Sequence, residues 1–142
     1  MNEKVATIMI KDLITLSPDS LLSEVYQIFS THKIHHIPVT EDGALVGMVT
    51  TYDLWKANIS HEQYGSVSVS KVMSTKLVKI EPEDKVGTAA ELFLDNRFHA
   101  LPVVSEGKLV GLVTTFDVLK YEFKKEYKDA ILFKDVLDKN EG

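Results

Sequence analysis

The chain has 142 residues, 44% of them hydrophobic and 26% charged, and its formal net charge is −5. It has no cysteine, which excludes disulfides, thiolate metal sites and cysteine nucleophiles. It also lacks an apolar run near the roughly 20 residues that span a membrane, and the lysine and arginine clusters that bind nucleic acid. The first residues contain no long apolar stretch, so we do not expect a secretory leader. We therefore expect a cytoplasmic protein with no membrane or nucleic-acid partner.

The first elements of the chain are predicted to be a strand and a helix. The apolar run at residues 13–16 ends before Pro18, which suits a short strand stopped by proline. Apolar residues then recur at helical spacing between residues 21 and 29. Ser20 precedes this pattern, and its counterpart later in the chain is Asp84; both residue types are typical helix N-caps.

Two more strands and a second helix follow. Residues 37–39 are apolar, and residues 41–43 have the composition of a tight turn. Residues 45–51 are mostly apolar and β-branched, as expected of a buried strand. A second helix is expected to begin near Asp53. The order of elements is therefore β-α-β-β-α.

The second half of the chain repeats the first at a constant offset of 64 residues. Residues 5–56 align without a gap on residues 69–120, and 17 of the 52 pairs are identical. Such a repeat indicates two copies of one supersecondary unit. We assign residues 1–58 to repeat 1, 59–68 to a polar linker, 69–121 to repeat 2, and 122–142 to a helical C-terminal tail.

One such unit buries too little apolar surface to be stable alone. We therefore predict an α/β (α+β) fold in which two β-α-β-β-α repeats pack sheet to sheet about a pseudo-twofold axis. That packing would create two related clefts between the repeats. Gly47 and Gly111 lie inside predicted strands, where glycine weakens a sheet unless another group approaches closely. We expect that group to be a bound ligand or the facing repeat.

These motifs resemble the tandem CBS-domain pair, also called a Bateman module. The phrases that carry the resemblance are HHIPV with GMVTTYDL in repeat 1, and HALPV with GLVTTFDV in repeat 2. The resemblance covers residues 5–120. It implies a standalone sensor or regulatory subunit that is not an enzyme and has no catalytic cofactor. The implied regulatory ligand is an adenosine-containing molecule, namely AMP, ADP, ATP or S-adenosylmethionine.

The resemblance also implies partners. A regulated protein, as yet unidentified, is one. A second copy of the chain is the other, because related pairs bury apolar helix faces such as Val25/Phe29 and Ala89/Phe93 in a homodimer.

The resemblance implies which residues bind the ligand. A carboxylate at a strand-to-helix junction can accept ribose hydroxyls, and a helix N-terminus with a threonine hydroxyl can donate to a phosphate. Asp53 and Asp117 have the first role, and Thr50 and Thr114 the second. The remaining candidates are histidines for the phosphate and strand residues for the adenine: His35, His36 and His99; Ile14, Thr15 and Ile37 in one cleft; and Val78, Lys79 and Leu101 in the other.

Simpler roles remain open for the same residues. The aspartates could be helix N-caps, the threonines ordinary strand residues, the histidines spacers, and the apolar residues plain core. Arg97 is the only arginine, which disfavours tight binding of a triphosphate.

Two other classes of function are alternatives to a ligand sensor. The pair could be a structural dimerisation module with empty clefts. The cluster at residues 32–36 could serve a metal-responsive protein, since His32 and His36 would share a face if the helix extended that far. No carboxylate accompanies them, so no metal site is predicted. The chain has no P-loop, Ser-His-Asp or Rossmann motif, which leaves catalysis unsupported.

Overall fold

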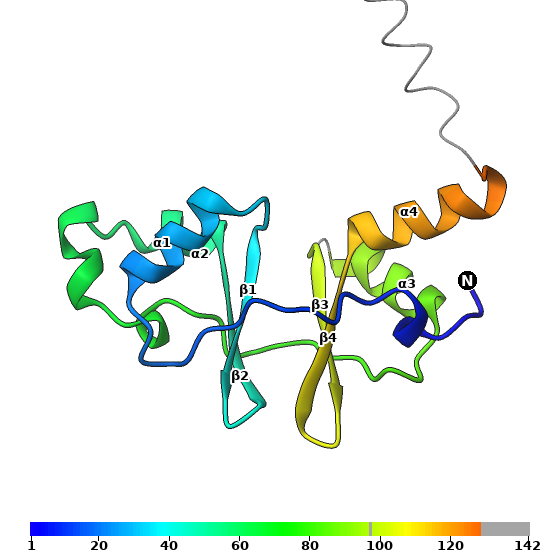
Figure 1. The fold of residues 1–142 in the computed structure, drawn as a ribbon, viewed down its shortest axis with the longest axis horizontal. Helices are drawn as coiled ribbons and strands as arrows, with labels where there is room; N and C mark the ends of the chain where they lie inside the picture. Colours follow the sequence, from blue (N-terminus) through cyan, green and yellow to red (C-terminus); the bar gives the residue numbers. More distant parts are fainter. Residues whose placement is uncertain (97, 129–142) are drawn as a thin grey trace, which may run out of the picture.

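The structure is a computed structural model that describes residues 1–96 and 98–128 (Figure 1). Its elements follow one another as a repeated series. In chain order they are the 3₁₀ turn Val5–Thr7, α1 (Leu22–Thr31), β1 (His36–Glu41), β2 (Ala44–Thr50), α2 (Thr51–Ala57), the 3₁₀ turns His61–Ser66 and Val69–Lys71, α3 (Val86–Asn96), β3 (Ala100–Ser105), β4 (Lys108–Thr114) and α4 (Thr115–Glu126).

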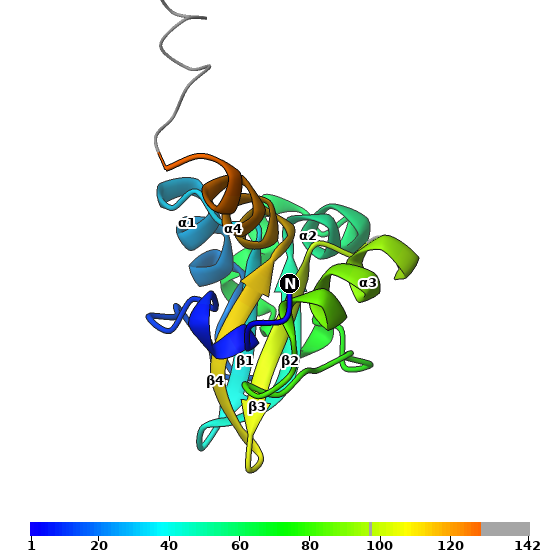
Figure 2. The same cartoon turned by 90° about the vertical axis from the view of Figure 1, so that its right-hand side faces the viewer.

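Two antiparallel hairpins, β1–β2 and β3–β4, form the centre of the fold, as the sequence predicts. Both turns depend on glycine, since Gly43 and Gly107 have φ angles of 81° and 78°. The helices α1 and α2 lie beside the first hairpin, and α3 and α4 beside the second (Figures 1 and 2). The hairpins meet where the amide of Leu109 donates to the carbonyl of Gly43 at 3.0 Å.

The strands predicted at residues 13–16 and 77–80 are shorter than expected. Each makes one parallel ladder pair, Leu16 with Val39 and Ile80 with Val103. The reason is geometric: both segments are crossing from one hairpin to the other, so only their last residue lies alongside a strand.

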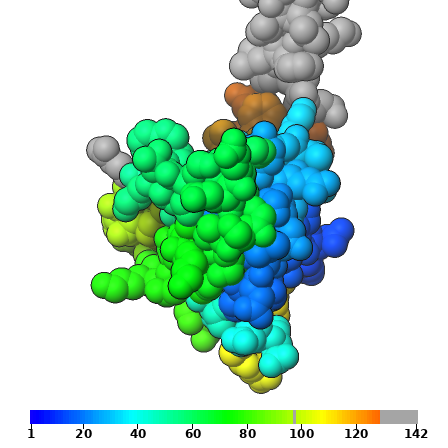
Figure 3. All heavy atoms as spheres, turned by 90° about the vertical axis from the view of Figure 1, so that its left-hand side faces the viewer, coloured from blue at the N-terminus to red at the C-terminus, as the bar shows by residue number. Residues whose placement is uncertain are grey.

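Each repeat has its own hydrophobic core, and each core is completed by a residue from the start of the other repeat. Val69 is fully buried in the core of repeat 1, and Val5 is fully buried in the core of repeat 2. We call residues 3–10 leader 1 and residues 67–74 leader 2. The leaders are therefore exchanged between the repeats. Figure 3 shows the face of repeat 1, where α1 lies beside the segment that leads into leader 2.

Leader exchange explains why the predicted helix caps are wrong. The amide of Leu22, at the start of α1, donates to the carbonyl of Val67 at 2.9 Å. The amide of Val86, at the start of α3, donates to the carbonyl of Glu3 at the same distance. Backbone carbonyls of the opposite leader thus accept the hydrogen bonds that a capping side chain usually accepts. Ser20 and Asp84 instead accept hydrogen bonds from the preceding turns, at Ser17 and Glu81.

The helix faces predicted to lie in a dimer interface instead pack inside their own repeats. Val25 and Ala89 are fully buried, Phe93 is 7% exposed, and Phe29 packs against the core of repeat 1. The reason is that a two-stranded hairpin needs the whole apolar face of its helix to form a core. The second helix of each repeat exposes apolar side chains at equivalent positions, Tyr52 and Trp55 on α2 and Phe116 and Leu119 on α4. The first helices also expose Tyr26 on α1 and Leu94 on α3.

The two repeats differ most at their C-terminal ends. The helix α2 has 7 residues and ends at Ala57, whereas α4 has 12 residues and continues to Glu126. The linker contains the 3₁₀ turn His61–Ser66, which packs against α1 through Tyr26, His61 and Tyr64. Most of the predicted helical tail, including Ile131 and Leu137, lies outside the described residues. Within the described residues, no helix is long and apolar enough to cross a membrane.

Candidate functional site

The crossing segments decide which candidate residues share a site. The amides of Ile10 and Leu112 donate to each other's carbonyls at 2.8 and 3.0 Å, which ties the start of one segment to β4. Its end is tied to β1, where the amide of Leu16 donates to Pro38 at 3.1 Å. Residues 11–16, here called floor 1, therefore run from β4 to β1.

The second crossing segment has the equivalent pairing. Met48 and Ser74 exchange backbone hydrogen bonds at 3.0 and 2.9 Å, and the amide of Ile80 donates to Pro102 at 3.1 Å. Residues 75–80, here called floor 2, therefore run from β2 to β3. Because β4 ends at Thr114 and β2 ends at Thr50, each floor begins beside the strand that supplies a candidate threonine and aspartate.

The strand connections thus group the predicted residues into two sets, and each set draws on both repeats. Floor 1 and β1 belong to repeat 1, but the threonine and aspartate beside them belong to repeat 2. Site 1 comprises Ile14, Thr15, Ile37, Thr114 and Asp117. Site 2 comprises Val78, Lys79, Leu101, Thr50 and Asp53.

The candidate aspartates are the third residues of their helices, not the N-caps. Thr50 is the N-cap of α2: its hydroxyl accepts from the Asp53 amide at 3.1 Å, and the Asp53 carboxylate accepts from the Thr50 amide at 2.8 Å. Thr114 and Asp117 form the same reciprocal pair at 3.2 and 2.8 Å. The alternative in which the aspartates are N-caps is therefore wrong; they complete capping boxes.

A capping box fixes the carboxylate without using all of its acceptors. In both repeats the backbone amide bonds to Oδ2, and Oδ1 has no hydrogen-bond partner among the described residues. The oxygen Oδ1 can therefore accept from a ligand hydroxyl. The two repeats differ in the threonine, since the Thr114 hydroxyl also donates to Asp117 Oδ2 at 2.8 Å.

The three candidate histidines lie at the helix-bearing ends of the hairpins. His35 and His99 are exposed, and their carbonyls accept from the amides of Thr51 and Thr115 at 3.2 and 3.0 Å. These bonds hold the residues before β1 and β3 against the starts of α2 and α4. His36 is half-buried at the start of β1, opposite Thr50 in the ladder.

The electrostatics of His36 show that both repeats contribute to its surroundings. Burial lowers the pKa of His36 below its ordinary value, and the charges of His35 and His99 lower it further. The carboxylate of Asp53 acts in the opposite direction. A phosphate placed among these groups would favour the protonated imidazole and oppose the effect of burial.

The candidates for adenine contact have varied surroundings. Ile37 and Leu101 are fully buried in their own cores, so only the backbone of their strands is open to a ligand. Ile14 is half-buried against the core of repeat 1, and Val78 is 45% exposed. Lys79 and Thr15 are exposed. The ordinary core role therefore remains open for Ile37 and Leu101.

A cavity of about 320 Å³ lies beside floor 1. Thr15 is the one candidate residue in its lining, and the other lining residues come from floor 1 and from the turn end of the hairpins. Thr114 and Asp117 are not part of its lining. The residues that line the cavity are Lys11, Asp12, Leu13, Thr15, Thr40, Gly43, Leu109 and Val110.

Gly47 and Gly111 are crowded by the facing repeat, which is one of the two predicted causes, and the crowding side chains are the leader methionines. A Cβ atom at Gly111 would lie 2.5 Å from the sulfur of Met9, and one at Gly47 would overlap the sulfur of Met73. Sequence reasoning did not identify this role of the methionines. The available signal was that Met9 and Met73 are identical residues at equivalent positions of the two repeats.

The histidine cluster does not form a metal site within the part of the chain that the structure describes. The helix α1 ends at Thr31, so His32 and His36 do not share a helical face. The ring Nδ1 of His32 lies 2.9 Å from the hydroxyl of Thr31. No group of three or more potential metal ligands is found among residues 1–96 and 98–128.

Comparisons with known proteins identify the two repeats. A model of the CBS domain matches residues 5–54 and 69–124. The CBS domain-containing protein YhcV of Bacillus subtilis is 31% identical over 124 residues, which cover 87% of this chain and 89% of YhcV. The inosine-5'-monophosphate dehydrogenase of Thermoplasma acidophilum is 34% identical over 125 residues, 87% of this chain. Those residues are 24% of the dehydrogenase, so the chain spans about a quarter of that enzyme.

Solved structures share the paired fold. The CBS-domain containing protein ATU1752 from Agrobacterium tumefaciens matches with a TM-score of 0.75 and 28% identity over 84% of this chain and 99% of that one. CBSX2, in complex with AMP, matches with a TM-score of 0.77 and 24% identity over 87% and 98% of the two chains. The pair of protein MJ0100, in complex with 5'-methylthioadenosine and S-adenosyl-L-methionine, has a TM-score of 0.75 at 24% identity over 88% and 99%.

Proposed function

The chain belongs to the CBS domain family, and on that premise we propose that it is a regulatory protein that binds an adenine nucleotide or adenosine derivative between its repeats. Binding changes its shape or assembly and so reaches a regulated protein. AMP is the first ligand to test, followed by ADP and S-adenosylmethionine. ATP ranks behind them because the chain has one arginine.

The observation that carries this proposal is the pair of capping boxes. Asp53 and Asp117 are each held by a backbone amide at 2.8 Å through one carboxylate oxygen, and the other oxygen is left to accept from a ligand. Each box lies beside a floor that comes from the other repeat. A ligand held by both would therefore bridge the repeats, which is the geometry that a ligand-dependent change of shape requires.

The experiment is a thermal-shift screen followed by calorimetry with the full chain. A ligand at 100 times its Kd stabilises the folded state by about 2.7 kcal/mol. The variants Asp53→Asn and Asp117→Asn should each weaken AMP binding by about tenfold, or about 1.4 kcal/mol. Glu24→Gln is the matched control, because Glu24 accepts from the Leu21 amide at 2.9 Å in the capping box of α1 and belongs to neither site. Normal binding in both aspartate variants would remove the ribose role.

A structural module with empty sites is the second candidate function, and the exposed face of α2 and α4 favours it. Tyr52 and Trp55 are 60% and 76% exposed, and their counterparts Phe116 and Leu119 are both 68% exposed. Because these positions are equivalent in the two repeats, the face has the internal pseudo-twofold of the chain. A face of that kind suits contact with a second copy, so we place the proposed homodimer there.

The dimer is tested by light scattering at micromolar concentration. A dimer mass that Trp55→Asp and Leu119→Asp both reduce to that of a monomer would support this face. A monomer mass for the unaltered chain would contradict the dimer. A dimer with no ligand in the screen would favour the structural module over the sensor.

A further inference from the structure

The exchanged leaders are held by matching sets of backbone hydrogen bonds. The amides of Val5 and Ala6 donate to the carbonyls of Asp84 and Pro82 at 2.7 and 3.0 Å. In the other repeat, the equivalent bonds run from Val69 to Ser20 at 2.7 Å and from Ser70 to Pro18 at 3.3 Å. We call residues 17–21 turn 1 and residues 81–85 turn 2. Leader 1 is therefore bound to turn 2, and leader 2 is bound to turn 1.

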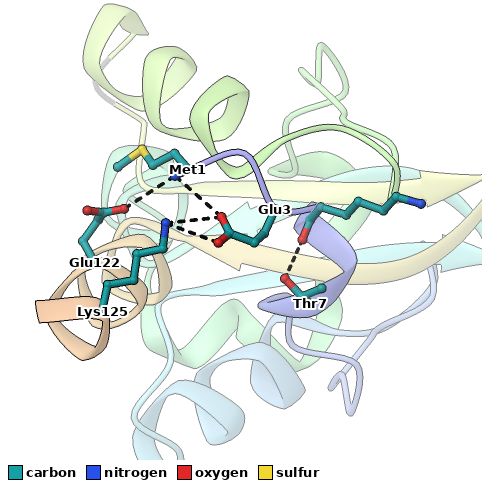
Figure 4. Close-up of polar contacts among 6 residues, drawn as sticks. Met1, Glu3, Thr7, Glu122 and Lys125 are labelled. Atoms are coloured by element: carbon teal, nitrogen blue, oxygen red, sulfur yellow. Dashed lines mark hydrogen bonds and ion pairs between the residues drawn. The ribbon is translucent and has the colours of Figure 1, made fainter. Parts of the chain in front are cut away.

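Side chains reinforce both attachments. Val5 and Val69 are fully buried, and Met9 and Met73 pack on Gly111 and Gly47. Leader 1 also reaches α4, where the ammonium of Lys125 lies 3.3 Å from the carboxylate of Glu3 (Figure 4).

These attachments form a closed circuit through both sites. Leader 1 continues along the chain into floor 1, and floor 1 continues into turn 1. Turn 1 binds leader 2, which continues into floor 2 and then turn 2, and turn 2 binds leader 1. A displacement of either floor is therefore passed to the other through covalent connections and the four leader-to-turn hydrogen bonds.

The floors are the weakest parts of this circuit. Between their anchors they make no regular strand, and each has a single ladder pair at its end. Local opening of such segments costs less free energy than opening of the hairpins. A ligand that orders one floor would reduce the cost of ordering the other.

We propose that the circuit couples site 1 to site 2, so that occupation of either site tightens binding at the other. The floors are coupled even when no ligand is bound. The effect of this coupling on ligand affinity rests on the proposed function. Coupling between sites in proteins is typically fivefold or more in affinity. The two parts are tested separately.

Hydrogen exchange in the free chain tests the circuit itself. Val69→Ala loosens leader 2 in repeat 1, and the circuit should carry that change to floor 1. The amide protons of Ile10 and Leu112, which anchor floor 1 to β4, should then exchange about fivefold faster than in the control. The control is Val25→Ala, which removes the same atoms from a fully buried position in the same core but lies outside the circuit.

Equal exchange rates in the two variants would overturn the proposal. If the alanine variants are too unstable to study, Val69→Ile and Val25→Ile add one methyl group at the same positions, and the same order of rates is expected. Calorimetry with AMP on the full chain then tests the affinity. Asp53→Asn should weaken the remaining site by about fivefold. An unchanged affinity there would overturn the coupling, whereas a chain that binds no AMP at all would overturn the proposed function and leave the exchange result standing.

Discussion

Repeat 1 and repeat 2 have the same fold and the same capping boxes, but the residues around the capping boxes differ. His36 lies near the box of repeat 1, where its equivalent in repeat 2 is Ala100. The Thr114 hydroxyl donates to Asp117, and no such bond from the Thr50 hydroxyl is found among the described residues. The two repeats therefore share the capping-box residues and the histidines His35 and His99, but only repeat 1 has a histidine at the position of His36. The two sites should not respond identically.

The largest expected effect concerns the crowded glycines. Gly111→Ala and Gly47→Ala should both lower the free energy of unfolding, because a Cβ atom would enter the space of a methionine. The loss should be larger at Gly111, by about 3 against about 1 kcal/mol, within the usual range for overpacking. The reason is that the backbone oxygen of Ile10 lies 3.2 Å from the new atom at Gly111, whereas the three nearest atoms at Gly47 all belong to the flexible side chain of Met73.

Urea unfolding measures both losses. The double variant Gly47→Ala with Met73→Ala should recover part of the packing strain, and Gly65→Ala is the control because nothing lies near that position. Equal losses at Gly47 and Gly111 would contradict the difference between the repeats.

The capping threonines should show the next largest effect. Thr50→Ala and Thr114→Ala each remove an N-cap, which costs about 1 kcal/mol. The loss should be greater for Thr114, because its hydroxyl also donates to Asp117. Thermal unfolding measures both, and replacement by serine should restore stability at each position. A larger loss at Thr50 would reverse the comparison.

The third prediction concerns pH and depends on His36. Its pKa is lowered in the folded state by burial and by the charges of His35 and His99, so the unfolded chain binds more protons below about pH 6.5. The free energy of unfolding should therefore fall as the pH falls through that region. The variant His36→Ala should reduce this dependence, and His32→Ala, at an exposed position, is the control.

A bound phosphate should reverse the effect on His36. Because the phosphate favours the protonated ring, AMP binding should tighten between about pH 8 and pH 6, until protonation of the phosphate itself opposes the trend. Calorimetry with adenosine gives the comparison without a phosphate. Identical pH profiles for AMP and adenosine would show that the histidines do not contact the phosphate.

The smallest expected effect is at the surface. The ion pair of Glu3 with Lys125 joins leader 1 to α4, and repeat 1 has no equivalent because α2 is shorter. Both side chains are exposed, so Lys125→Gln should change thermal stability only slightly, and the change should vanish at high salt. A large, salt-independent loss would show that α4 depends on the leader more than its exposed contacts indicate.

The sequence predicted the parts of the fold that depend on local patterns. The β-branched strands, their glycine turns and the order of elements follow from residue types that act within a few positions. The capping boxes were also available as the pattern Thr-x-x-Asp, although the aspartate was considered as the N-cap and is in fact the third residue of its helix. The grouping of Ile14 with Asp117 was not available, because it depends on backbone pairing between distant segments, and backbone groups have no sequence signature.

The helix caps illustrate the same limit. Ser20 and Asp84 have the right residue types but lie two residues before the first residues of α1 and α3, Leu22 and Val86. The carbonyls of Val67 and Glu3 already accept from the free amides of those two helices. A carbonyl is present at every residue, so composition cannot indicate which one will fill this role.

Leader exchange also sets the order in which the protein can fold while it is being synthesised. Repeat 1 cannot complete its core until Val69 has left the ribosome, and Val5, which is made before repeat 2, has no core to enter until repeat 2 exists. Leader 1 is therefore synthesised well before the core that it completes. Contacts between such distant segments slow folding, so leader 1 should stay exposed to chaperones until most of the second repeat has been translated.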